Sequence, residues 1–186
     1  GGYLGSTLCT ELVQKGFEVT GIDNFFFKKD TLKHLYDKKN FDFHNFDVRE
    51  DKLYTEFVPK NDLIIPLAGI VGAPMCDKHH ELAFEVNEQQ IKKISDITSK
   101  DQAIIYPTTN SGYGTTSKHV ICTEEMDLNP ISHYGRTKVN AEKYLFKKEN
   151  AISLRLATVF GVSYRNRIDL LVNFFVYNGV KFKKIK

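Results

Sequence analysis

The sequence predicts a doubly wound α/β fold, in which a parallel sheet is covered by helices on both faces. Short apolar runs typical of strands alternate with helical stretches along nearly the whole chain, and no segment is repeated internally. Strands that are joined through helices pair in parallel, with right-handed connections. A glycine-rich turn placed directly before the first helix supports the same fold class.

The first elements begin right at this turn. A helix over Ser6–Lys15 carries its apolar residues on one face and stops at Gly16, a favourable residue for a helix C-terminus. The segment Phe17–Ile22 alternates like a strand and ends in Asp23 and Asn24. A second short strand, Phe41–Phe46, and a short helix, Glu50–Phe57, complete the first part of the chain.

The later elements follow the same alternation. The apolar run Asp62–Leu67 is typical of a strand buried on both faces. A long helix over His80–Ser99 has apolar residues at helical spacing. The remaining predicted elements are a strand at Ala103–Tyr106, a helix at Ser132–Lys148, a strand at Ile152–Leu156 and a helix at Asp169–Tyr177.

The composition argues against several classes of protein. Hydrophobic residues make up 41% and charged residues 26%, as in an ordinary globular domain. No stretch approaches the roughly 18–20 apolar residues of a membrane span, and no secretory signal is visible. The net charge is only +3 and the lysines are scattered, so we expect no nucleic-acid partner. The three cysteines lack metal-binding spacing, and their odd number predicts a cytoplasmic protein with reduced thiols. His79 and His80 are adjacent and so point apart on a helix, and we therefore expect no metal site.

The glycine turn is the first candidate for ligand binding. Gly2, Tyr3, Leu4 and Gly5 match the last two glycines of a GxxGxxG pattern, and a helix follows at once. The free N–H groups of such a helix bind a pyrophosphate, and glycines let the phosphate approach. A plain turn before a helix is the alternative interpretation of this segment.

Asp23 strengthens the ligand interpretation. It ends the next predicted strand, close to the roughly 20-residue interval at which an acid binds the adenosine ribose of a dinucleotide. A carboxylate there favours NAD, because it repels the extra phosphate of NADP. An ordinary turn aspartate before Asn24 is the alternative, and the nearby Lys28 and Lys29 leave NADP open.

A tyrosine and a lysine form the candidate catalytic pair. Tyr134 and Lys138 have YxxxK spacing near the start of a predicted helix, which places both on one face. A phenol has a pKa of about 10, and a nearby ammonium and an oxidised nicotinamide both lower it. Tyr134 then acts as a base on a sugar hydroxyl. Thr109 lies just past a predicted strand, where its hydroxyl orients the same substrate group. An exposed Tyr and Lys on a helix is the alternative.

With these motifs, the chain resembles the extended short-chain dehydrogenases/reductases, the NAD-dependent epimerase/dehydratase family of nucleotide-sugar enzymes. The resemblance rests on the glycine turn, on the stretch from Tyr106 to Gly114 that contains Thr109, on the YxxxK pair and on Leu154–Gly161. It implies a Rossmann-type domain and oxidation of a nucleotide-sugar hydroxyl, at carbon 4, by NAD. The family's dehydratases carry Asp-Glu after the catalytic hydroxyl, whereas Asn110 and Ser111 stand here. The resemblance therefore favours an epimerase or a dehydrogenase.

The resemblance also implies further site residues. Expected cofactor contacts, besides the glycine turn, Asp23 and the catalytic pair, are Asn24, Asp47, Val48, Leu67, Ala68, Gly69 and Val159. Expected substrate contacts are Met75, Thr109, Asn110, Thr158, Arg165, Arg167 and Asn173. The two arginines suit a diphosphate, and solvated loop arginines are the alternative. The loop at Gly72–Cys76 follows the predicted strand Asp62–Leu67 and should line the sugar pocket, with a turn that merely covers the core as the alternative.

Within the family, three segments look closest to the GDP-heptose 4-dehydrogenase-like enzymes of bacterial surface-polysaccharide pathways. They are Ile64–Cys76, Tyr106–Gly114 and Arg155–Asn173. The resemblance implies a GDP-linked sugar as substrate and a homodimer formed through the helices His80–Ser99 and Ser132–Lys148. The loop Val162–Arg167 departs from this subgroup at Tyr164 and Asn166.

The ends of the chain predict a fragment. It opens at Gly1 without Met or a preceding strand, and closes in Lys183–Lys186. We expect residues 1–186 to be a partial NAD-binding domain, with the substrate-binding part starting near 160, and the first strand and most of the C-terminal substrate domain missing. Two other hypotheses remain: a non-catalytic NAD(H)-binding module that regulates or holds a partner, and a truncated product without activity of its own.

The first testable prediction concerns the choice of cofactor. Because Asp23 ends the strand that faces the ribose, we expect tighter binding of NAD than of NADP. Calorimetric titration of both dinucleotides into the complete gene product measures the two dissociation constants. Asp23→Asn should narrow the difference between the dissociation constants of NAD and NADP. Equal or tighter binding of NADP to the unaltered protein would contradict the prediction.

Overall fold

The computed structural model describes residues 1–27, 31–116 and 120–185. Lys28 and Lys29, which left NADP open, lie outside the described residues. The chain divides into two compact units, the first of Gly1–Asp47 with Thr158–Lys186 and the second of Val48–Ala157. The extent of the NAD-binding domain over 1–186 stays a prediction.

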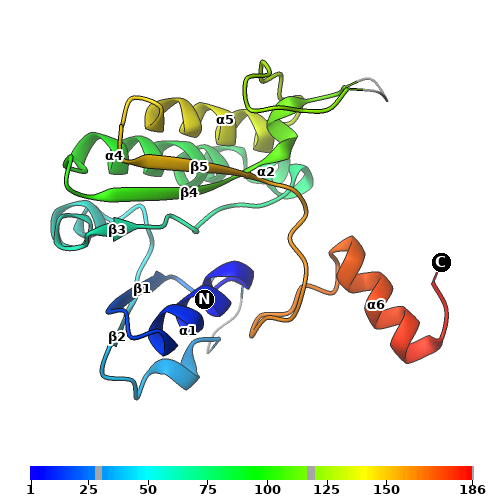
Figure 1. Ribbon diagram of the computed structural model, residues 1–186, viewed down its shortest axis with the longest axis horizontal. Helices are drawn as coiled ribbons and strands as arrows, with labels where there is room; N and C mark the ends of the chain where they lie inside the picture. The colour runs from blue at the N-terminus through cyan, green and yellow to red at the C-terminus, as the bar shows by residue number, and fades with distance from the viewer. Residues whose placement is uncertain (28–30, 117–119, 186) are drawn as a thin grey trace. The chain divides into compact units, whose positions relative to one another are not determined.

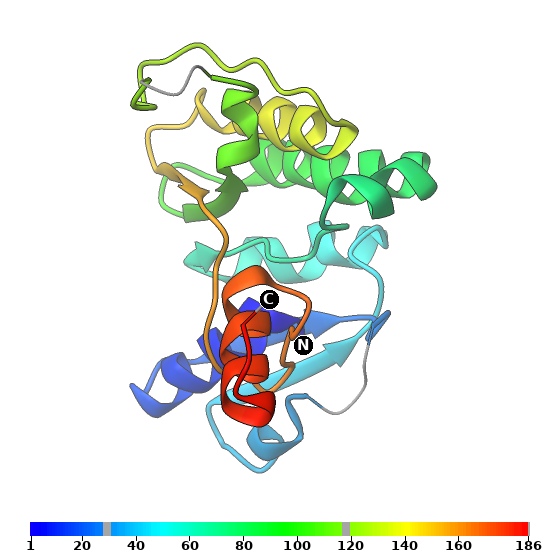
Figure 2. The same ribbon diagram turned by 90° about the vertical axis from the view of Figure 1, so that its right-hand side faces the viewer.

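The first unit is built around two parallel strands. Strand β1 (Val19–Asp23) pairs in parallel with β2 (Phe41–Asn45) (Figure 2). In this register, Asp23 stands opposite Asn45 at the carboxyl ends of the strands. Helix α1 (Tyr3–Gln14) contacts β1, and a short 3₁₀ helix, η1 (Lys33–Leu35), precedes β2. Helix α6 (Leu171–Phe182) is the last helix of this unit. Its core consists of Val13, Leu32, Leu35 and Phe41.

The second unit contains a three-stranded parallel sheet of order β3-β4-β5. Its strands are β3 (Leu63–Ile64), β4 (Ala103–Thr109) and β5 (Ala151–Leu156). Helices α4 (Gln90–Ile97) and α5 (His133–Leu145) lie side by side over β4 and β5 (Figure 1). The other helical segments are η2 (Leu53–Phe57), η3 (Val58–Lys60), α2 (Ala73–Lys78), α3 (His80–Phe84), η4 (Glu85–Gln89) and η5 (Asn110–Tyr113).

The predicted fold class is confirmed. Every strand pair in the described ranges is parallel, and helical segments connect successive strands, as in a Rossmann-type domain. The most buried side chains in the second unit include Ile91 and Ile94 of α4, Ile104 of β4 and Leu145 of α5, each 1% exposed or less. Among the residues placed by the structure, no helix is long and apolar enough to cross a membrane.

The predicted strand Asp62–Leu67 was wrong in length. Only Leu63 and Ile64 pair with β4, opposite Ala103 and Ile104. Pro66 has no N–H to donate to a neighbouring strand, so the ladder stops before it. The chain continues without regular structure to Gly72.

The predicted loop at Gly72–Cys76 was also wrong, because α2 begins at Ala73. Pro74 stands in the first turn of this helix, where its missing N–H costs nothing. The predicted helix His80–Ser99 is present, but it consists of α3, a π-helical segment at η4, and α4, which ends at Ile97. Predicted elements elsewhere differ from the observed ones by a few residues at their ends.

A buried asparagine explains how the irregular segment after β3 is held. Asn87 of η4 is 1% exposed. Its side-chain oxygen accepts from the Ile70 N–H at 2.9 Å, and its amide nitrogen donates to the Ile70 carbonyl at 2.9 Å. The Asn87 side chain thus makes the two backbone hydrogen bonds with Ile70 that a neighbouring strand makes in a sheet. Gly69 fits beside it, since a Cβ there would lie 3.2 Å from the Asn87 oxygen.

We therefore expect Asn87→Leu to destabilise the fold. The change keeps a similar volume but leaves the buried Ile70 N–H unpaired, which costs about 1–3 kcal/mol, and leaves the Ile70 carbonyl with the weak Cys76 thiol donor at 3.2 Å. Denaturant unfolding followed by circular dichroism measures the free energy of unfolding. The matched control is Asn178→Leu, whose amide bonds the Phe174 carbonyl at an exposed site. Equal losses of stability in both variants would contradict the assignment.

Candidate functional site

The candidate site residues divide between the two units. The first unit holds Gly2, Tyr3, Leu4, Gly5, Asp23, Asn24, Asp47, Thr158, Val159, Arg165, Arg167 and Asn173. The second holds Val48, Leu67, Ala68, Gly69, Met75, Thr109, Asn110, Tyr134 and Lys138. The predicted phosphate and ribose contacts thus belong to the first unit, and the catalytic residues belong to the second.

The glycine turn forms the N-terminus of α1. Gly2 is the cap residue, with an extended backbone, and its carbonyl accepts from the Ser6 N–H at 3.0 Å. The N–H groups of Tyr3, Leu4 and Gly5 lie in the first turn, where a helix has no internal acceptors for them. The segment therefore has the donors and the positive helix end that bind an anion.

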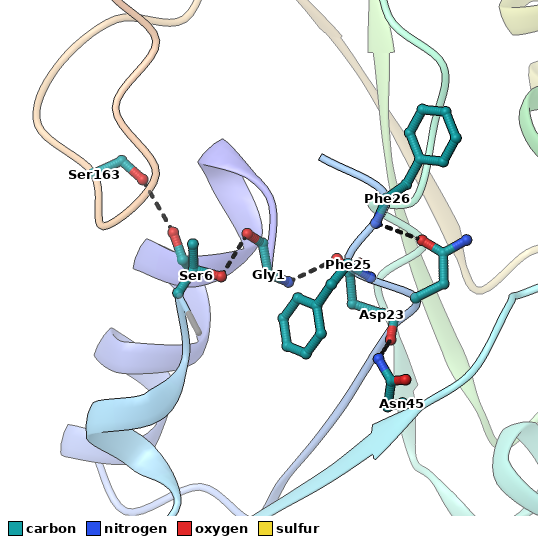
Figure 3. A network of polar contacts seen from close by, with 9 residues as sticks. Gly1, Ser6, Asp23, Phe25, Phe26, Asn45 and Ser163 are labelled. Carbon is teal, nitrogen blue, oxygen red and sulfur yellow. Dashed lines mark hydrogen bonds and ion pairs between the residues drawn. The ribbon is translucent and has the colours of Figure 1, made fainter. Parts of the chain in front are cut away.

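The predicted ribose ligand, Asp23, is the last residue of β1 and its side chain is 28% exposed. One carboxylate oxygen accepts from the Phe25 N–H at 2.6 Å, and the other lies 2.9 Å from the amino group of Gly1 (Figure 3). The Asn45 amide donates to the Asp23 carbonyl at 3.0 Å. The turn role that we considered as the alternative is therefore present.

Asn24 continues this turn. Its side-chain oxygen accepts from the Phe26 N–H at 3.0 Å, and its amide donates to an Asp47 carboxylate oxygen at 2.9 Å. Phe25, between them, has a positive φ of 51°, which is uncommon for a residue with a side chain. Successive side-chain-to-backbone bonds hold this backbone in place.

Residues after Thr158 fold back onto α1. The Ser163 hydroxyl donates to the Tyr3 carbonyl at 2.7 Å and lies 3.0 Å from the Ser6 hydroxyl (Figure 3). Asn173 donates to the Tyr3 hydroxyl and to the Arg167 carbonyl, both at 2.9 Å, and accepts from the Gly161 N–H at 2.9 Å. Asn173 thus holds the loop itself, whatever it contributes to a ligand.

The two loop arginines differ in their surroundings. The Arg165 guanidinium lies 4.5 Å from the centre of the Phe27 ring, and its pKa is lowered by burial and then by Arg167. Arg167 bonds both carboxylate oxygens of Asp169, the shortest at 2.5 Å. The charge of Arg167 is therefore already paired. Thr158 is exposed and Val159 half-buried in the same segment.

In the second unit, Thr109 and Tyr134 meet at the carboxyl end of β4. Thr109 is the last residue of the strand, which runs three residues beyond its predicted end at Tyr106, and Thr109 is 8% exposed. Its hydroxyl accepts from the Ser111 N–H at 3.1 Å as the cap of η5. Tyr134 stands in the first turn of α5, which Ser132 caps.

The ionisation of Tyr134 depends on its burial. Burial raises its pKa, a hydrogen bond with the Thr109 side chain opposes this, and the Cys76 thiol adds to it. We expected a lowered pKa at this phenol, and the protein alone holds it above the usual value. Added positive charge is needed to bring it down.

Lys138 lies one turn after Tyr134 and is 8% exposed. Its ammonium donates to the Pro107 carbonyl at 2.9 Å and lies 4.1 Å from the centre of the Tyr106 ring. Burial lowers the pKa of Lys138 to about 7, while Glu142 and then Cys76 raise it. A lysine that titrates near neutrality in such a setting is typical of a functional site.

An apolar cluster carries several of the remaining candidates. Its buried residues are Ile70, Cys76, Ala83 and Val86. Val48, Ala68, Met75 and Tyr134 are partly buried and pack against it. Met75 and Tyr134 thus share one cluster, although Met75 belongs to a helix and its neighbour Cys76 is fully buried. Leu67 and Gly69 are half-buried, and Asn110 is exposed in η5.

Glu142 was missed by the sequence reasoning. It extends the Tyr134–Lys138 spacing by four more residues and is 2% exposed. An acid that follows a catalytic lysine by one turn was the available signal. Its partner Arg155 was noted only as part of a motif. Among the described residues, no group of three or more His, Cys, Asp or Glu is placed to hold a metal.

Comparison with known proteins agrees with these features. The model of the NAD dependent epimerase/dehydratase family matches residues 1–177. The uncharacterized UDP-glucose epimerase YtcB of Bacillus subtilis is 30% identical over 182 residues, which cover 88% of this chain and 56% of that protein. The chain thus spans a little over half the length of this relative.

Solved structures share the fold. The UDP-glucuronic acid 4-epimerase of Bacillus cereus, in complex with UDP-glucuronic acid and NAD, has a TM-score of 0.80 at 24% identity, over 97% of this chain and 60% of that one. The enzyme WbmG of Bordetella bronchiseptica, in complex with NAD and UDP, has a TM-score of 0.74 at 25% identity, over 86% and 51%. With the family model matching nearly its whole length, this chain belongs to the NAD dependent epimerase/dehydratase family.

Proposed function

We propose that the protein oxidises a hydroxyl of a nucleotide-linked sugar, at carbon 4, with NAD as the hydride acceptor. The observation that carries this proposal is the contact between the Thr109 and Tyr134 side chains at the carboxyl end of β4, with Lys138 buried one turn away. This arrangement pairs a substrate-orienting hydroxyl with a general base and a cation that favours its ionised form.

The protein's own residues perform the proton chemistry. The Thr109 hydroxyl orients the sugar hydroxyl toward Tyr134. The Tyr134 phenolate takes the hydroxyl proton as the carbon–hydrogen bond breaks, and the Lys138 ammonium stabilises the phenolate beforehand. Bound NAD would supply the acceptor for the hydride. Because burial raises the pKa of Tyr134 in the protein alone, the phenolate needs a nearby positive charge to form.

The first unit has the donors that suit a dinucleotide. Free N–H groups at Gly2–Gly5 fit a pyrophosphate, and the partly exposed Asp23 carboxylate fits a ribose diol. We propose that Asn24, Asp47, Val48, Leu67, Ala68, Gly69 and Val159 complete the cofactor contacts. Solved relatives that contain NAD, among them the B. cereus epimerase, support the proposal.

The substrate proposals are graded by their surroundings. Arg165, whose guanidinium lies over the Phe27 ring, is the better candidate for a substrate diphosphate, whereas Arg167 must leave Asp169 to bind one. We also propose contacts from Met75, Asn110, Thr158 and Asn173. The motif resemblance favours a GDP-linked sugar of surface-polysaccharide synthesis, while the similar proteins named above carry UDP in their names or complexes.

Mass spectrometry of the complete gene product, incubated with NAD and a panel of GDP-, UDP- and dTDP-linked sugars, tests the proposal. Oxidation of one sugar, or its inversion at carbon 4, is the expected result; because inversion leaves the mass unchanged, it is followed by proton NMR of the same mixtures. Loss of water from the sugar would contradict the inference, drawn from Asn110 and Ser111, that the protein is not a dehydratase. A panel left unaltered although NAD binds would favour the non-catalytic alternative.

On the sugar that reacts, Tyr134→Phe should lower turnover by a factor on the order of 10²–10⁴, because the proton acceptor is lost and little volume changes. NAD affinity should stay within a few-fold of the unaltered protein. The matched control is Tyr144→Phe on the same helix, ten residues further along and outside the catalytic pair. Turnover of Tyr134→Phe near that of the control would remove Tyr134 from the mechanism.

We further propose that the complete protein is a homodimer that pairs through α4 and α5. These helices lie side by side on one face of the sheet of the second unit, and correspond to the predicted pairing helices (Figure 1). Size-exclusion chromatography with light scattering at micromolar concentration should give twice the chain mass. A mass of one chain throughout that range counts against the dimer.

A further inference from the structure

Helix α5 buries an ion pair against β5. The Glu142 side chain is 3% exposed and that of Arg155 is 13% exposed. The Arg155 Nε donates to both Glu142 oxygens, at 3.1 and 3.4 Å. The Arg155 Nη1 donates to the Tyr113 hydroxyl at 3.2 Å and to the Glu124 carbonyl at 3.1 Å. The guanidinium is therefore fixed by several groups at once.

The same carboxylate acts on Lys138. Glu142 follows Lys138 by four residues, so the two lie on one face of α5. The groups facing the ammonium are the Pro107 carbonyl and the Tyr106 ring from β4, Cys76 from α2 and Glu142 itself. Glu142 is the largest contribution that favours the charged lysine against its burial.

A structural explanation of the ion pair alone is weak. Burying two charges costs several kcal/mol of desolvation for each ion, and apolar residues of similar volume often serve stability as well or better. A fixed negative charge near Lys138 favours the ammonium form of this lysine, which apolar residues cannot do. Arg155 holds this carboxylate in place by donating to both of its oxygens.

We propose that Glu142, held by Arg155, is a positioning residue of the reaction, whose carboxylate keeps Lys138 in the ammonium form beside Tyr134. This rests on the proposed function for its role in turnover, whereas the effect on Lys138 is a property of the protein alone. Glu142 thereby acts on the base through the lysine and does not contact substrate.

The test is the titration of Lys138 in the complete gene product. NMR of protein labelled with ¹⁵N at the lysine side chains, assigned with Lys138→Met, follows its pKa without substrate. Glu142→Gln should lower that pKa by about one unit or more, because an opposite charge is removed. Arg155→Gln breaks the same ion pair but leaves the carboxylate, so the pKa should not fall. The control is Glu81→Gln, which removes an exposed acid from α3.

Two outcomes overturn the proposal. Equal falls in Glu142→Gln and Arg155→Gln would show a purely structural pair, and an unchanged pKa in Glu142→Gln would show no electrostatic effect. If the single variants do not fold, the double variant Glu142→Gln/Arg155→Met, which leaves no unpaired buried charge, should still lower the pKa. An unshifted double variant overturns the proposal equally.

Turnover supplies a separate measurement. With an active sugar, Glu142→Gln should move the alkaline limb of the pH profile of kcat to lower pH, because the ammonium is lost earlier, while KM changes little. Glu142→Asp should restore part of this shift. If no sugar reacts but the Lys138 pKa falls, the proposed function fails and the electrostatic effect stands. An active enzyme whose pH profile ignores Glu142→Gln would contradict the role in turnover.

Discussion

Helix α5 packs polar as well as apolar residues against the sheet, and the candidate catalytic site depends on how those polar groups are paired. Lys138 bonds the Pro107 carbonyl of β4, and Glu142 bonds Arg155 of β5. Each contact satisfies a group whose burial without a partner would cost stability. Both contacts join α5 to the sheet, and Tyr134 in the first turn of the same helix meets the Thr109 side chain at the end of β4.

In the first unit, the side chains proposed to bind a ligand are also held by hydrogen bonds within the protein. Asp23 and Asn24 accept from backbone N–H groups two residues further on, around a phenylalanine with positive φ. Asn173 joins three separate backbone and side-chain groups of the loop. Side chains that are proposed to meet a ligand thus also shape the backbone that presents them, so substitution at Asp23 or Asn173 changes both properties.

Much of the architecture was predictable from local patterns. Alternating strands and helices, the glycine cap of α1 and the YxxxK spacing on α5 depend on residues close in sequence, and all are present. The shortened β3 and the helix at Ala73 were missed because Pro66 and Pro74 have opposite effects. Proline ends a strand ladder but is accepted in the first turn of a helix, so position decides.

The sequence by itself determined the fold class, the family and the residue types available for proton transfer, because periodicity and motif spacing are local properties. Only the tertiary structure decided their ionisation and partners. Burial raises the pKa of Tyr134 and lowers that of Lys138 to about 7, and Glu142 opposes the second effect. Burial and charge depend on residues distant in the chain, such as Cys76 and Arg155, which no spacing along α5 reveals.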